Sequence, residues 1–139
     1  MADDVVLNKA ASIERCVMRA REEYAADPAS FAQNYSRQDA AILNIQRACE
    51  AALDMGQHVI RREKLGIPQS ARDVFNLLAQ AGWIELALAE NLKRMVGFRN
   101  IAVHDYQAIQ LPIMVAIIEK HLDDFLQYSR VLLQRDASQ

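Results

Sequence analysis

Apolar side chains recur every three or four residues along most of the chain, which is the spacing of one face of an α-helix. Asp27-Pro28 ends the first such stretch, because the residue before a proline avoids helical backbone angles. The sequence therefore predicts a first helix over residues 4–26 that packs lengthwise against its neighbours. Its apolar stripe comprises Val6, Ala10, Ile13, Val17, Ala20 and Tyr24.

Four more helices are expected from the same spacing and from residues that start and stop helices. Ser36 with Asp39, and Ser70 with Asp73, resemble capping boxes. Pro112 suits the first turn of a last helix. These signals predict an all-α fold, an up-and-down bundle of four to five helices in a single domain over residues 1–139. The expected ranges of the four helices are 37–64, 71–80, 83–102 and 112–133.

Length and composition agree with one globular domain. The chain has 139 residues, of which 52% are hydrophobic and 24% are charged. Only four glycines and three prolines occur, which favours long uninterrupted helices. The formal net charge of −2 lacks the basic excess of most nucleic-acid-binding domains. Any RNA must therefore be bound by a local basic patch or with the help of a partner.

Other features bear on the compartment and on cofactors. The chain shows no signal peptide, and no apolar run approaches the about 20 residues of a membrane span, so we expect a cytoplasmic protein. Cys16 and Cys49 are expected to be small buried hydrophobic residues. His58, His104 and His121 lack metal-ligand spacing, and no glycine-rich phosphate loop occurs. We therefore expect neither a metal nor a cofactor.

One segment, from Arg99 to Tyr106, departs from the regular apolar pattern. Arg99 lies in line with the apolar stripe of the expected fourth helix, and burying an unpaired guanidinium is costly. It must face a carboxylate, a subunit boundary or an anionic ligand. Asn100 and His104 are four residues apart, so Asn100 can orient the imidazole. Tyr106 returns to the Arg99 face if the helix continues.

The relative directions of Arg99 and His104 pose a geometric problem. On a regular helix, residues five apart diverge by roughly 140°. The two side chains can act on one small group only if the helix bends or ends there, or if a second subunit completes the site. Ordinary structural roles are also open: Arg99 in an ion pair, His104 at a helix C-terminus, and Tyr106 as a boundary aromatic.

The pattern Arg99-Asn100-x-x-x-His104 resembles the signature of HEPN-domain proteins, and His104-x-Tyr106 resembles the HepT branch of that family. The resemblance implies a dimeric helical bundle that acts as a metal-independent ribonuclease toxin of a type VII toxin–antitoxin pair. It implies that His104 is the acid or base, that Arg99 holds the scissile phosphate and that Asn100 supports them. It also implies that an MNT-type nucleotidyltransferase antitoxin transfers AMP to Tyr106.

Two alternatives remain open at this point. One is a non-catalytic HEPN partner of a nucleotidyltransferase, which binds a nucleotide or presents a surface, and the other is a purely structural helical module. The basic clusters do not decide between them. Cations that cap a helix C-terminus are the favoured explanation of the first cluster, with phosphate contact as the alternative, and a solvated face explains the second cluster as well as phosphate contacts do. The clusters are Arg61, Arg62 and Lys64, and Lys93 with Arg94.

Overall fold

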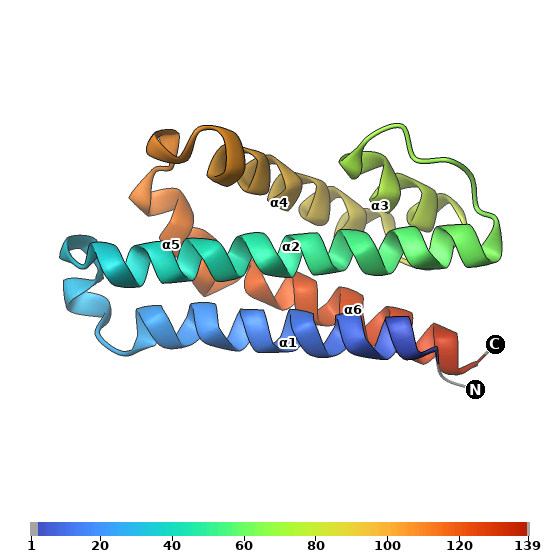
Figure 1. The fold of residues 1–139 in the computed structure, drawn as a ribbon, viewed down its shortest axis with the longest axis horizontal. Coiled ribbons are helices and arrows are strands. Elements are labelled where there is room, and N and C mark those ends of the chain that lie inside the picture. The colour runs from blue at the N-terminus through green and yellow to red at the C-terminus, as the bar shows by residue number, and fades with distance from the viewer. Residues whose placement is uncertain (1–2, 139) are drawn as a thin grey trace.

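A computed structural model describes residues 3–138, in which the regular elements are all helical. In Figure 1, α2 lies between α1 on one side and α3 and α4 on the other, while α5 and α6 cross behind it. The two ends of the chain lie together at one end of the bundle. The expected all-α bundle is confirmed. The elements are α1 (Asp4–Ala25), η1 (Pro28–Gln33), α2 (Tyr35–Glu63), α3 (Ala71–Gln80), α4 (Leu86–His104), η2 (Tyr106–Ala108), α5 (Leu111–Lys120) and α6 (Leu122–Ala137).

Small residues in the middle of α2 allow neighbouring helices to pack directly on its backbone. A Cβ atom placed on Gly56 would lie 2.6 Å from Val74 Cγ1 of α3 and 2.7 Å from the Tyr128 hydroxyl oxygen of α6. That hydroxyl donates a 2.7 Å hydrogen bond to the carbonyl of Ala52. Gly56 therefore fixes the approach of α3 and α6 to α2, and α4 packs on α2 and α3 in turn.

The start of α2 differs from the expected capping box. Asn34 caps the helix, because its Oδ1 atom accepts a 3.1 Å hydrogen bond from the backbone amide of Arg37. Asparagine is among the strongest N-cap residues, and it begins the helix two residues before the expected start. Ser36 therefore lies inside the first turn, and Asp39 is available for a different contact. At α3 the prediction is confirmed, since Ser70 is the N-cap.

The last expected helix is in fact two helices. His121 adopts φ −120° and ψ −9°, which ends α5 and redirects the chain into α6. The apolar spacing continues across this break, so hydrophobic periodicity alone did not reveal it. The helix of residues 83–102 also begins later than expected, at Leu86. Trp83 precedes it in a turn, where the Arg135 guanidinium lies 4.7 Å from the centre of the indole ring.

No helix within residues 3–138 is long and apolar enough to cross a membrane. Cys16 and Cys49 are buried free thiols, as the sequence predicted. Burial raises the pKa of both, for Cys49 to about 12.

Candidate functional site

The segment from Arg99 to Tyr106 lies where α4 ends. Phe98 and Ala102 are buried and hold the last turns of α4 on the core. The backbone amide of Asp105 donates a 2.8 Å hydrogen bond to the carbonyl of Ile101, and the helix stops immediately after His104. The helix is continuous from Arg99 to His104, so the two side chains leave it in different directions, as predicted. A second subunit, or the end of α4 directly after His104, is needed to bring both side chains onto one small group.

The guanidinium of Arg99 has no acidic partner within residues 3–138. None of the ion pairs among these residues includes it. The side chain is half-buried, and its Nε atom is buried without a hydrogen-bond acceptor. Its positive charge acts on Cys49 of α2, where it lowers the pKa of the thiol and partly offsets the increase that burial causes. Of the possibilities that the sequence leaves for Arg99, an anionic ligand or a subunit boundary therefore remains.

His104 is exposed at the C-terminal end of α4, where solvent and a substrate can reach its imidazole. Asn100 lies one turn earlier and is half-buried. Among the described residues, no hydrogen bond joins the two side chains. The supporting role of Asn100 thus stays a prediction that rests on helical spacing.

The position of Tyr106 differs from the expectation of a continuing helix. Because α4 ends at His104, Tyr106 opens η2 and does not return to the Arg99 face. Its hydroxyl donates a hydrogen bond to Oδ1 of Asp39 in the first turns of α2. Burial, together with this contact to the Asp39 carboxylate, raises the pKa of Tyr106 to about 12. A groove of about 320 Å³ surrounds the pair, with Tyr35, Gln38 and further residues of η2 and α5 as its walls.

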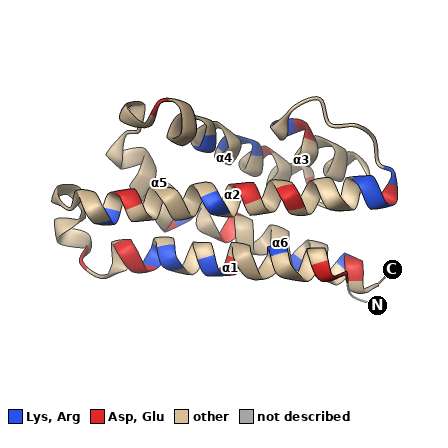
Figure 2. Ribbon diagram, in the orientation of Figure 1, with Lys and Arg blue, Asp and Glu red and all other residues tan. Residues whose placement is uncertain are grey.

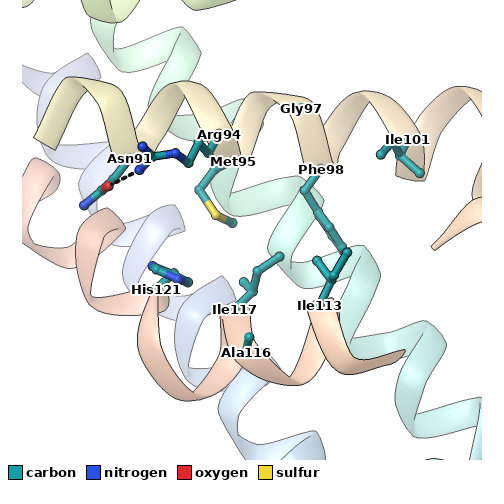
Figure 3. A pocket seen from close by; sticks show the side chains of 10 residues that line it. All are labelled: Asn91, Arg94, Met95, Gly97, Phe98, Ile101, Ile113, Ala116, Ile117 and His121. Carbon is teal, nitrogen blue, oxygen red and sulfur yellow. Dashed lines mark hydrogen bonds between the residues drawn. The ribbon is translucent and has the colours of Figure 1, made fainter. Parts of the chain in front are cut away.

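Exposed apolar side chains lie within the segment and on α5, and sequence analysis did not predict their exposure. Ile101 and Val103 on α4 are 42% and 44% exposed, and Ile113 on α5 is 50% exposed. Figure 3 shows the groove between α4 and α5, into which Phe98 of α4 and Ile117 of α5 project. This α4–α5 groove has a volume of about 390 Å³. Ile101 lies off the regular stripe of α4, and this was the available sequence signal of an apolar residue outside the core.

The basic clusters noted in the sequence are largely occupied by contacts within the chain. Figure 2 shows acidic and basic residues interspersed along α1 and α2. Arg62, expected to cap its helix or to contact a phosphate, donates to Asp3 at 2.9 Å and to Asp136 at 2.6 Å. Lys93 pairs with Glu90 at 2.8 Å. Arg94 binds the side chain of Asn91 at 2.8 Å, as the dashed line in Figure 3 marks.

The other two histidines have structural contacts. His58 lies 2.6 Å from Asp3, and His121 lies 3.6 Å from Asp124. Within residues 3–138, no three side chains of His, Cys, Asp or Glu gather into a group that could hold a metal ion.

Comparison with known proteins agrees with the motif. The family model described as "Ribonuclease HepT-like" matches residues 13–132. The chain belongs to the ribonuclease HepT-like family. It is 49% identical over 130 residues to the mRNA nuclease HepT of Shewanella oneidensis. The aligned region covers 94% of this chain and 97% of that protein.

Chains in solved toxin–antitoxin structures have the same fold. A chain in the crystal structure of a toxin–antitoxin with AMP-PNP is 48% identical, with a TM-score of 0.90 over 94% of this chain and 98% of that one. The tri-AMPylated HEPN toxin of Shewanella oneidensis, in complex with its MNT antitoxin, is 49% identical. Its TM-score is 0.89 over 94% of this chain and 97% of that one. Such coverage leaves little of either chain unmatched.

Proposed function

We propose that this protein is an endoribonuclease toxin of a type VII toxin–antitoxin pair, acting in the cytoplasm. The observation that carries the proposal is the half-buried Arg99 guanidinium, which lacks an acidic partner among the described residues. Arg99 lies five residues before the exposed His104, in a chain 49% identical to an mRNA nuclease. A cation held in this way is suited to an oxyanion such as an RNA phosphate.

Cleavage of RNA without a metal requires proton transfer and charge stabilisation. A base removes the proton of the 2′-hydroxyl, and an acid protonates the 5′-oxygen that leaves. Histidine side chains titrate near neutral pH and serve in either role, which we assign to His104. Arg99 holds the scissile phosphate and stabilises the charge that develops on it. The products are a 2′,3′-cyclic phosphate and a 5′-hydroxyl. Asn100 supports this arrangement from the same helical face as His104.

The active form in this proposal is a homodimer. Arg99 and His104 point in different directions, so one chain supplies only part of a site around one phosphate. A two-fold axis beside the end of α4 places two arginines and two histidines around one cleft. Exposed Ile101 and the α4–α5 groove that it lines supply the apolar surface that a second copy would bury.

Neutralisation is assigned to an MNT-type nucleotidyltransferase antitoxin that transfers AMP to Tyr106. Support comes from a related toxin that is tri-AMPylated and bound to its MNT antitoxin. The Tyr106 side chain is 44% exposed and lies two residues after His104. Each added AMP brings a negative charge and a bulky base to the mouth of the cleft, which repels and blocks RNA. This inhibition does not require Tyr106 to share a helical face with Arg99.

A cleavage assay on purified protein tests the catalytic part of the proposal. His104→Ala should lower the rate of RNA cleavage by about 10²- to 10⁴-fold, the usual contribution of a general acid or base. Its helicity by circular dichroism should be unchanged, because His104 is exposed. Gln110→Ala, at an exposed position beyond the motif, is the control and should cleave like the wild type. Wild-type cleavage by His104→Ala would contradict the assignment.

A further inference from the structure

The Tyr106 hydroxyl is held by a carboxylate. Asp39 lies in the first turns of α2, and its Oδ1 atom accepts the hydrogen bond that the phenol of η2 donates. The bond joins residues 67 positions apart, so it is formed by the tertiary fold and not by local sequence. Both groups line the same open groove, and a nucleotide can therefore approach them together.

We propose that Asp39 is a catalytic residue of the modification reaction, which accepts the proton of the Tyr106 hydroxyl while that oxygen receives AMP. This inference rests on the proposed function, in which an antitoxin presents ATP with magnesium. The Tyr106 oxygen attacks the α-phosphorus and forms a new O–P bond. The bond from the α-phosphorus to the bridging oxygen breaks, and pyrophosphate leaves with that electron pair. The phenolic proton passes to Asp39 and from there to water.

The surroundings of Asp39 favour proton acceptance. No lysine, arginine or histidine within residues 3–138 forms an ion pair with it. Its neighbour on α2, Arg37, is directed to Glu23 of α1 at 3.3 Å. Among the residues that line the groove, Tyr35, Asp39 and Tyr106 are the ones that can ionise, and none is a cation. A cation beside a carboxylate stabilises its charge and weakens it as a base, so its absence matters.

The phenol itself needs such help. Its pKa is raised to about 12, so only a very small fraction is ionised at neutral pH. Direct attack by the phenolate would therefore be rare. A carboxylate already in contact with the O–H group removes the proton as the new bond forms, without prior ionisation. The same hydrogen bond also orients a lone pair of the oxygen away from α2.

A purely structural role is the competing explanation. In that case Asp39 only ties η2 to α2, through an exposed hydrogen bond of small net worth. Asp39→Asn separates the two explanations, because the asparagine Oδ1 still accepts a hydrogen bond from the phenol but is not a useful base. Asp105→Asn is the matched control. It removes one negative charge from the residue next to Tyr106, and the Asp105 side chain forms no hydrogen bond with that hydroxyl.

The experiment is a time course of intact mass for the full chain with its antitoxin, ATP and magnesium. Asp39→Asn should gain AMP about 10²-fold more slowly than the wild type, while Asp105→Asn should stay within about twofold. The phenol of Asp39→Asn must ionise unaided, so the AMP-transfer rate of this variant should rise with pH relative to that of the wild type. The ratio of the wild-type rate to the variant rate should therefore fall between about pH 7 and about pH 9. Taking the ratio cancels the pH dependence of the antitoxin. Circular dichroism and ribonuclease activity should match the wild type.

Three results would overturn the inference. They are an unchanged rate for Asp39→Asn, an equal slowing of Asp105→Asn, and a slowing of Asp39→Asn that is the same at every pH. Tyr106→Phe distinguishes this failure from failure of the proposed function. If the wild type gains AMP and Tyr106→Phe does not, Tyr106 is the acceptor and only the role of Asp39 is at stake. If both gain AMP equally, the acceptor assignment itself is wrong.

Discussion

The hydroxyl of Tyr106 is bound to Asp39 of α2, beyond the end of the helix that carries Arg99 and His104. The regular spacing of a helix would have placed Tyr106 on the same face as Arg99, but α4 ends first. The candidate cleavage residues and the candidate modification residue thus belong to adjoining surfaces. They can be changed independently by mutation.

Tyr106→Phe should therefore leave cleavage intact while removing control by the antitoxin. We expect RNA cleavage within about twofold of the wild type, because the phenol transfers no proton in the cleavage step. The free energy of unfolding should fall by about 1 kcal/mol or less, since the lost hydrogen bond is exposed. After incubation with antitoxin, ATP and magnesium, residual ribonuclease activity should stay high in the variant and disappear in the wild type. Equal loss of activity in both proteins would refute this.

The proposed dimer predicts the effect of a charge in its interface. Ile101→Asp should weaken self-association by about 10²-fold and lower cleavage with it, because an unpaired carboxylate would be buried between copies. Ile67→Asp is the control, at a site 79% exposed in the loop before α3. Sedimentation velocity at micromolar concentration checks the prediction. A wild-type protein that is monomeric and fully active would contradict the dimer itself.

The helices were predictable because each buries a regular apolar stripe. Val6, Ile13 and Val17 of α1 are fully buried at the expected positions. The exceptions have local causes that periodicity does not contain. Asn34 was the better N-cap for α2, and His121 breaks the last helix without a proline or glycine.

The candidate site was chosen from the residues that break the pattern, and the roles of its residues stay predictions. Arg99 was singled out because a cation interrupts an apolar stripe, and it lacks an acidic partner within residues 3–138. The contact between Tyr106 and Asp39 was not predictable, since it depends on how η2 packs beside α2. Nor was the structural role of Arg62, which draws together residues from both ends of the chain.

Metal removal should separate the two proposed reactions. RNA cleavage by His104 and Arg99 should persist in EDTA at nearly the untreated rate, because the mechanism uses side chains alone. AMP transfer to Tyr106 should stop in EDTA, since the triphosphate reacts as its magnesium complex. Both rates are measured on the same protein sample, cleavage by product analysis and transfer by intact mass. Cleavage that is lost in EDTA and restored by added metal would contradict the mechanism.

Asp3 ties the beginning of the chain to α2 and α6. Its carboxylate lies 2.6 Å from His58 Nε2 and 2.9 Å from Arg62 Nη1, and its Oδ1 caps α1 at the amide of Val5. Arg62 in turn binds the buried Asp136 at 2.6 Å. The hydrogen bond from His58, with those of Arg62 and Val5, holds the pKa of Asp3 well below its ordinary value of 3.8 despite partial burial.

A carboxyl group with a lowered pKa in the folded state stabilises the fold above its unfolded pKa and loses that effect as it protonates. Asp3→Asn keeps the helix cap but lacks the charge, so it should lower the free energy of unfolding by about 2 kcal/mol near neutral pH. The difference from the wild type should shrink as the pH falls below about 4. Urea unfolding across this range measures it. Asp54→Asn, which breaks an exposed pair with Lys9, is the control and should cost about 0.5 kcal/mol or less. A difference for Asp3→Asn that persists unchanged at low pH would show that its charge does not stabilise the fold.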